Sequence, residues 1–153
     1  MAWTTPKTDW ETGALVSPGD LNAVSENLAE LDRVRKTIAA HTTKADISIP
    51  NSSTFVDIGN NFNLTITTAG GDVLVHFHGT VTAHDFKLDL DIDGTRQGDA
   101  DHGLRRGGGH ADNELVNFTR LVQNLSAGSH TFKLQGKHDT TLRAGAQFWV
   151  REI

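Results

Sequence analysis

The chain has 153 residues, enough to bury one sizeable core, and its apolar residues amount to 37% before its 15 glycines are counted. A net charge of -5 argues against DNA or an anionic membrane as the main partner, since both bind dense basic surfaces, and the absence of cysteine excludes disulfides and thiolate metal sites. No apolar run is long enough to cross a membrane and the start lacks a secretory signal, so we expect the protein to be made in the cytosol.

Residues 1–17 are expected to form an extended docking arm. They show neither the period of a helix nor that of a strand, and they carry two of the three tryptophans, Trp3 and Trp10. Two large apolar rings on a segment too short to form its own core indicate that the arm docks onto another protein. The alternative is that both rings fold back on the chain's own domain.

A helix is predicted from about residue 18 to residue 40, within a helix and linker that extend over 18–45. Ser17 can cap this helix, Pro18 suits its first position, and Asp20 can complete a capping box. These residues mark where the helix should begin.

The apolar residues of this helix recur every three or four positions and form one stripe. They are Leu21, Val24, Leu28, Leu31, Val34 and Ile38. Written as heptads, the stripe has leucine at its a positions and mostly β-branched residues at its d positions, which favours three or four associated helices over two. A plain amphipathic helix packed on its own β domain is an equal alternative. The candidate assembly and docking residues are Trp3, Trp10, Leu21, Val24, Leu28 and Leu31.

Residues 46–153 are predicted to form a jelly-roll-like β domain, because the hydrophobic period changes to two and no further helix is indicated. The predicted strands are 46–50, 53–58, 62–68, 72–82, 85–93, 113–122, 129–138 and 145–152. Turn sequences such as Asp93-Gly94 separate them. The fold class is therefore mainly β, with an N-terminal arm and a single α-helix followed by an antiparallel jelly-roll-like β-sandwich.

Strand alternation also predicts which side chains face outward. In the strand 85–93, the apolar residues should face the core, while Asp89 and Asp91 should face water or a neighbouring molecule. Trp149 lies in an apolar terminal strand, and we expect it to be buried. The β domain would then lack an exposed aromatic platform.

The stretch 98–112 has no period, contains several glycines and is the longest predicted loop, which we expect to be mobile. Its polar side chains are candidates for contact with a ligand or receptor. They are Asp101, His102, Arg105, Arg106 and His110.

His76 and His78 are the first metal candidates, since alternation places both imidazoles on one face of a strand. Together with Gly70 they match the opening of a cupin signature, but the glutamate and the proline expected later in that signature are missing. A cupin-like metalloprotein is therefore a lower alternative, and a metal shared across a symmetry axis is another. The main expectation is two histidines without a ligand, and no cofactor.

Asp89, Asp91, Asp93 and Gly94 match the first half of a calcium-binding EF-hand loop. The glutamate that should complete the loop is replaced by Ala100, and the alternating leucine and isoleucine indicate a strand. We therefore expect a solvated strand face rather than a calcium site. The sequence also lacks the motifs of nucleophilic catalysis, so no enzymatic activity is expected.

Two segments of the sequence carry recognisable patterns. The first has Trp3, then Pro6-Lys7-Thr8-Asp9-Trp10, then Gly13, and is followed by Asp20-Leu21-Asn22 and Asn27-Leu28. It resembles the N-terminal segment of virion proteins of tailed bacteriophages and prophages, in which a similar stretch leads into a short helix and a variable β domain. The second runs from Leu125 to Leu134 and, with Asp93-Gly94, is similar to the jelly-roll modules of phage fibres and capsid decorations.

The resemblance implies a non-enzymatic structural protein of the virion, assembled in the host cytoplasm and usually a homotrimer. The N-terminal segment would attach it, and the β domain would be exposed. Its partners would be further copies of itself and other virion proteins of the tail, baseplate or capsid, with no nucleic acid and no membrane. Attachment to a tail or fibre and decoration of a capsid both stay open. A lectin-like module that binds a host-surface glycan is the alternative from a different class.

Overall fold

The computed structural model describes residues 17–36, 38–59, 62–82, 85–107, 113–138 and 140–153. The chain divides into two compact units, Met1–Thr37 and Ile38–Ile153. The second unit begins at Ile38, whereas the hydrophobic period of the sequence places its start at residue 46. A strand that the sequence analysis does not predict, β1 (Ile38–Thr42), accounts for the difference.

The first unit contains the helix α1, Pro18–Lys36. Its start is the predicted one, because the amide of Asp20 donates to Ser17 Oγ at 3.2 Å and the amide of Ser17 donates to the Asp20 carboxylate at 2.9 Å. These reciprocal bonds form a capping box. Among the described residues, no helix combines the length and the hydropathy that a membrane span requires.

The helix ends at Lys36 and not near residue 40. Ile38 continues the apolar spacing of the helix, but it lies in β1, where it pairs with Arg151. Pairing of all five β1 residues with β12 (Gln147–Glu152) outweighs the helical spacing of one apolar side chain. The part of the expected linker that covers 38–42 is therefore an edge strand of the β domain.

The second unit is an antiparallel jelly-roll-like β-sandwich, which confirms the predicted fold class. The other described strands are β2 (Ile47–Ile49), β3 (Val56–Asp57), β4 (Asn63–Thr68), β5 (Gly71–Thr82), β6 (Lys87–Ile92), β7 (Thr95–Arg96), β8 (Arg105–Arg106), β9 (Glu114–Leu125), β10 (Gly128–Lys137) and β11 (Thr140–Leu142). Every predicted strand has a counterpart among these strands and β12. β7, β8 and β11 are additional, and with two or three residues each they are too short for a period to reveal.

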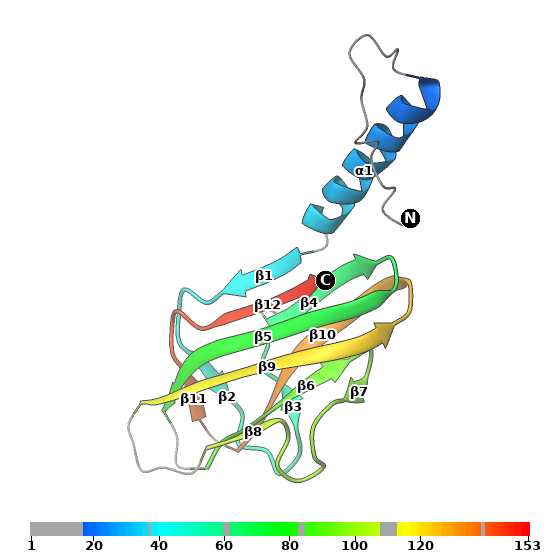
Figure 1. The fold of residues 1–153 in the computed structure, drawn as a ribbon. Coiled ribbons are helices and arrows are strands. Elements are labelled where there is room, and N and C mark those ends of the chain that lie inside the picture. The colour runs from blue at the N-terminus through cyan, green and yellow to red at the C-terminus, as the bar shows by residue number, and fades with distance from the viewer. Residues whose placement is uncertain (1–16, 37, 60–61, 83–84, 108–112, 139) are drawn as a thin grey trace. The chain divides into compact units, whose positions relative to one another are not determined.

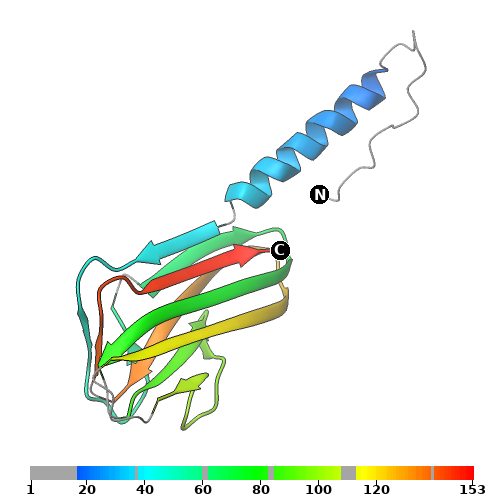
Figure 2. The ribbon, with the colours of Figure 1, turned by 60° about the vertical axis from the view of Figure 1, so that its left-hand side comes forward.

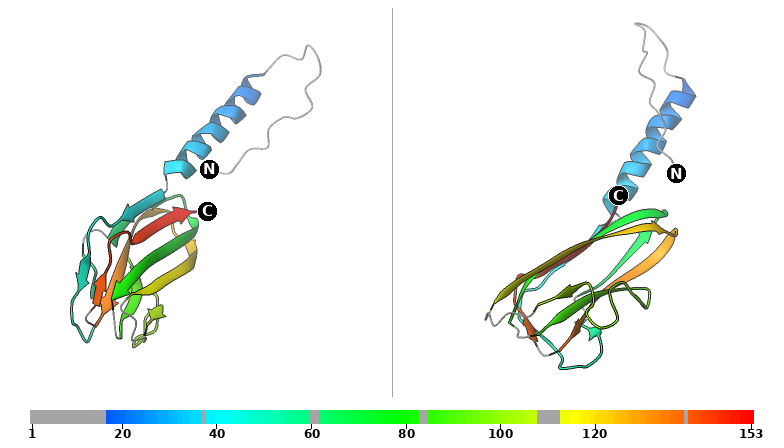
Figure 3. Two further views of the ribbon diagram at one scale, coloured as in Figure 1. Left: turned by 90° about the vertical axis from the view of Figure 1, so that its left-hand side faces the viewer. Right: turned by 60° about the horizontal axis from the view of Figure 1, so that its bottom comes forward.

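The strands form two sheets (Figure 1). The first sheet has the order β1-β12-β5-β9, and β11 and β2 continue it along the other end of β5. In the second sheet β10 is central, with β3 and β4 on one side and β6 on the other, and β7 and β8 pair with β6. The first sheet lies in front in Figure 1, and Figure 2 shows the same succession of strands after rotation. The right-hand view of Figure 3 shows the two sheets as separate layers.

The hydrophobic core lies between the two sheets. Its largest buried side chains are those of Phe62, Phe77, Phe86, Phe132 and Phe148. Phe62 meets Phe77 edge to face, with ring centroids 6.1 Å apart. Since strand side chains alternate, the inward set defines an outward set on each sheet, and the candidate functional residues belong to these outer faces.

Candidate functional site

Helix α1 carries an exposed apolar stripe. The exposed fractions are 60% for Leu21, 51% for Val24, 61% for Leu28 and 50% for Leu31. Large apolar side chains with half their surface in water gain free energy when a partner covers them. The stripe is shorter than predicted, because Ile38 belongs to β1, and the d positions inside α1 are one valine and one leucine. The preference for three or four helices that rested on β-branched d residues is accordingly weaker.

Trp3 and Trp10, the docking residues expected on the arm, lie outside the described residues. The structure therefore places four of the six predicted assembly residues, all on one helix.

The outer face of the first sheet is a second candidate surface. The register of β1, β12, β5 and β9 aligns its outward side chains in three neighbouring rows. These rows are Ile38, Arg151, Leu74 and Leu121; Ala40, Trp149, His76 and Thr119; and Thr42, Gln147, His78 and Asn117. The twelve residues are called the platform below. The first row is mostly apolar, the second contains the stacked rings of His76 and Trp149, and the third is polar.

The middle row of the platform is held together by direct contacts. The rings of His76 and Trp149 are stacked, with centroids 5.1 Å apart and an angle of 28° between their planes. The Nδ1 atom of His76 lies 2.9 Å from Thr119 Oγ1, within hydrogen-bonding distance. Partial burial, and secondarily the neighbouring His78, lowers the pKa of His76 below its ordinary value of 6.5. His76 is therefore neutral at pH 7, and the row as a whole is uncharged.

Trp149 faces outward and is half-buried, which corrects the expectation that it lies in the core. Its neighbours Phe148 and Val150 point inward and are fully buried, so alternation requires Trp149 to point the other way. The apolar composition of the strand concealed this alternation. The same rule, applied to 147–152, would have found the residue.

His76 and His78 share one face, as alternation predicts. The structure adds that this face is the outside of the first sheet and that His76 already contacts Thr119 and Trp149. Within the described residues, no group of three or more His, Asp or Glu side chains is placed to hold a metal ion. The described residues therefore provide no set of ligands for a cupin-like metal site.

The outer face of the second sheet differs from the prediction. Asp89 and Asp91 were expected to face water, but only 0% and 4% of their surfaces are exposed. The chain after β6 folds back over that strand, where the amide of Gln97 donates to the Leu90 carbonyl at 2.8 Å. Gly98 lies against Asp89, and a Cβ atom on it would approach Asp89 Oδ1 to 2.6 Å. The segment after β6 thus contacts the Asp89 carboxylate through Gly98, whereas the Asp91 carboxylate accepts from the Gly94 amide of the following turn.

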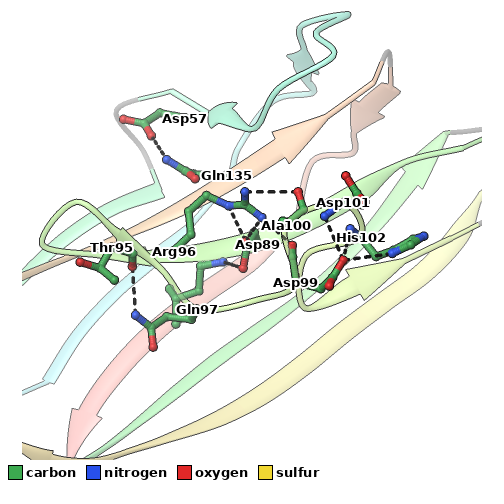
Figure 4. A network of polar contacts seen from close by, with 11 residues as sticks. Asp57, Asp89, Thr95, Arg96, Gln97, Asp99, Ala100, Asp101, His102 and Gln135 are labelled. Atoms are coloured by element: carbon green, nitrogen blue, oxygen red, sulfur yellow. Dashed lines mark hydrogen bonds and ion pairs between the residues drawn. The ribbon is translucent and has the colours of Figure 1, made fainter.

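Arg96 connects this loop to the sheet (Figure 4). Its Nε atom donates to Asp89 Oδ2 at 2.7 Å, and its Nη2 atom donates to the Asp99 carbonyl at 2.7 Å. The guanidinium also lies 4.0 Å from the centre of the Phe55 ring, a cation–π contact. The backbone amide of Leu90 supplies a further bond to Asp89 at 2.8 Å. The buried carboxylate is therefore paired and hydrogen-bonded, as its burial requires.

Asp93 and Gly94 form the two-residue turn of the β6–β7 hairpin, with φ values of 52° and 84°. The Asp91 carboxylate accepts from the Gly94 amide at 2.9 Å, and the Asp93 carboxylate accepts from the Thr131 amide at 2.8 Å and lies 2.6 Å from His130 Nδ1. The bond to Asp93 raises the pKa of His130, while the Thr131 amide and then His130 lower the pKa of Asp93. The half EF-hand pattern is thus explained by a hairpin whose carboxylates have structural partners.

The candidate loop residues do not converge on one site. Asp101, His102, Arg105 and Arg106 are all exposed. The amides of Asp101 and His102 bond to the Asp99 carboxylate at 2.9 and 3.0 Å, whereas the two arginines lie in β8, next to β6. The described part of the stretch, 98–107, contains this strand and a bridge between Asp99 and Gly103, and is not the structureless loop expected. His110 lies outside the described residues.

No family model and no curated protein matches the chain. Three solved structures with similar folds are the dimeric latent PorU from Porphyromonas gingivalis, the VP2 protein of infectious bursal disease virus, and a carbohydrate-binding module of Cellvibrio mixtus lichenase 5A in complex with cellotriose. Their identities are 9%, 15% and 16%, and their TM-scores are 0.42, 0.44 and 0.40. In the same order, the alignments cover 75%, 74% and 76% of this chain. They cover 12%, 31% and 88% of the three matched chains. At these identities the likeness concerns the fold alone.

Proposed function

We propose that the chain is a non-enzymatic structural component of a bacteriophage virion that assembles as a homotrimer through α1. In this proposal the N-terminal arm, with Trp3 and Trp10, attaches the protein to other virion proteins of the tail, baseplate or capsid. The β domain is then the exposed part. Assembly takes place in the host cytoplasm.

The observation that carries the proposal is the apolar stripe of α1. Leu21, Val24, Leu28 and Leu31 occupy heptad positions and are at least half exposed in the single chain. Covering each of them contributes roughly 1 kcal/mol, so an association of several helices gains several kcal/mol per copy. The resemblance of the N-terminal segment to phage virion proteins supports the trimer and the virion as its setting.

The oligomeric state tests the first part of the proposal. Light scattering of the intact chain at micromolar concentration should give three times its 16.6 kDa. The double variant L21S/L28S should shift this mass toward that of the monomer, because it removes half of the exposed stripe. L115S is the matched control, since Leu115 is 55% exposed but lies on β9. A wild-type chain that runs as a monomer contradicts the trimer.

Incorporation into particles tests the second part. In a phage or prophage that encodes the chain, deletion of residues 1–17 should leave a folded β domain that no longer joins the particle. The circular dichroism of the purified variant reports the fold, and antibody labelling of purified particles reports incorporation. Normal incorporation of the truncated protein would refute the role of the arm.

A further inference from the structure

The platform on the first sheet offers an aromatic ring with one open side. Trp149 stands between its cross-strand neighbours His76 and Ala40. The imidazole of His76 covers one face of the indole, at a centroid distance of 5.1 Å. The cross-strand neighbour on the other side is Ala40, which is exposed and lies on the edge strand β1. The second face of the indole is therefore bordered by the smallest side chain of the platform.

The surroundings of this open face are amphipathic. In the row on one side lie Ile38 and Arg151, and in the row on the other side lie Thr42 and Gln147. Thr42 and Gln147 are exposed and carry a hydroxyl and an amide. A ligand over Ala40 would thus meet an aromatic ring, an apolar side chain and neutral hydrogen-bonding groups at once.

We infer that the platform binds a carbohydrate, with the apolar face of a pyranose ring stacked on Trp149 above Ala40. A pyranose has C–H groups on one face and hydroxyls around its rim, so its C–H face suits the indole and its hydroxyls suit Thr42 and Gln147. Arg151 adds one positive charge and could pair with the carboxylate of an acidic sugar. This inference concerns the β domain alone and does not depend on assembly through α1.

The chemistry of the platform favours a carbohydrate over a second copy of the chain. The central and polar rows contain two threonines, a glutamine, an asparagine and two histidines. A flat protein face that covered them would have to supply a hydrogen-bond partner for each, because a buried polar group without one is costly. A sugar brings several hydroxyls and leaves the remaining groups in water.

NMR spectroscopy of the full-length chain with isotope-labelled tryptophan tests the inference. The chain has three indole N–H groups, and the variant W149F identifies the signal of Trp149. The probes are soluble oligosaccharides of glucose, of galactose and of N-acetylglucosamine, together with a sialylated oligosaccharide as the acidic arm. We expect at least one of them to shift the Trp149 signal, and a response confined to the sialylated probe would assign Arg151 a part in recognition.

Two variants and a control make the test specific. W149A removes the stacking surface, and A40L fills the space beside the indole while leaving Trp149 in place, so both should weaken binding about tenfold or more. L115A alters the same sheet outside the platform and should leave the affinity unchanged. Because Ala40 is exposed, A40L keeps the test valid if W149A fails to fold.

Three results would overturn the inference. The first is that no oligosaccharide shifts the Trp149 signal, and the second is that A40L binds as well as the wild type. The third is that A40L lowers the mass of the protein in solution, which would assign the platform to a contact between copies. A trimer that fails to bind any probe would leave the proposed assembly intact and reject only the platform.

Discussion

The outer faces of the two sheets differ in how far their outward polar side chains are exposed to solvent. On the first sheet, the outward side chains of His76 and His78 on β5 are partly exposed to solvent. On the second sheet, the acidic residues Asp89 and Asp91 are buried, and Arg96 of the following segment pairs with Asp89. Charge in a strand therefore does not identify the exposed surface of this protein, because the chain can supply its own cover.

The largest loss of stability should follow from removing Arg96, the cation that pairs with Asp89 on the second sheet. R96A leaves the Asp89 carboxylate buried without its ion pair, and we expect a loss of about 2 to 4 kcal/mol in the free energy of unfolding. Urea denaturation measures it. The control is R106A, which breaks the exposed pair with Asp85 and should cost less than about 0.5 kcal/mol. Equal losses for the two variants would mean that Arg96 does not stabilise the covering loop.

A smaller loss of stability is expected from adding a methyl group at Gly98, where the loop packs against Asp89. In G98A the new Cβ atom would meet the Leu104 amide at 2.5 Å and Asp89 Oδ1 at 2.6 Å, so the loop must shift at a cost of about 1 to 3 kcal/mol. G19A in α1 is the control, because its Cβ atom would lie 3.6 Å from its nearest neighbour, Ser17 Oγ. Thermal unfolding compares the two variants. A melting temperature of G98A at or above that of G19A would show that the loop is not closely packed.

A pH-dependent effect should appear where the hairpin of the second sheet meets β10. The pKa of His130 is raised, so its stabilising charge is fully present below the ordinary value of 6.5 and is lost as pH rises through the higher pKa of the folded protein. The pKa of Asp93 is lowered, so its contribution is present above 3.8 and is lost as pH falls through the lower folded value. The pair is therefore strongest between about pH 4 and 6.5.

The variant H130Q tests this dependence. Relative to the wild type, H130Q should lose more stability at pH 5.5 than at pH 8.5, by about 1 kcal/mol or less because Asp93 is partly exposed. Urea denaturation at the two pH values gives the difference. A loss that is the same at both would show that the ion pair contributes nothing beyond packing.

The smallest change in stability should come from substitutions on the outer face of the first sheet. Q147A and N117A remove exposed amides of the platform, and each should change the free energy of unfolding by less than about 0.5 kcal/mol. Denaturation curves that nearly overlay the wild type are expected. Losses comparable to that of R96A would mean that the platform is itself covered, and the contrast between the two sheets would disappear.

The fold could be predicted from the sequence to a large extent, because alternation and turn chemistry are local. Asp93-Gly94 predicts a hairpin turn, and the structure has positive φ angles at both residues. Ser17 and Asp20 likewise predict the start of α1. Ile38 shows where such local rules stop, because its place in β1 depends on pairing with Arg151, more than a hundred residues later.

The candidate sites were less predictable than the fold. Burial of Asp89 depends on a loop that returns over its own strand, and no period in the sequence reports this. Trp149 was assigned to the core on the apolar composition of its strand, although the alternation of Phe148 and Val150 points to the opposite face. The stacking of His76 on Trp149 joins β5 to β12, so it follows from the sheet order, which the sequence does not state.

The single residue between α1 and β1 has a mechanical consequence. Any pulling force that reaches the β domain through the N-terminal unit enters at Ile38, the first residue of an edge strand. The five residue pairs between β1 and β12 are the first junction through which that force passes into the sandwich. The resistance of the β domain to such a force therefore begins with the pairing of one short edge strand.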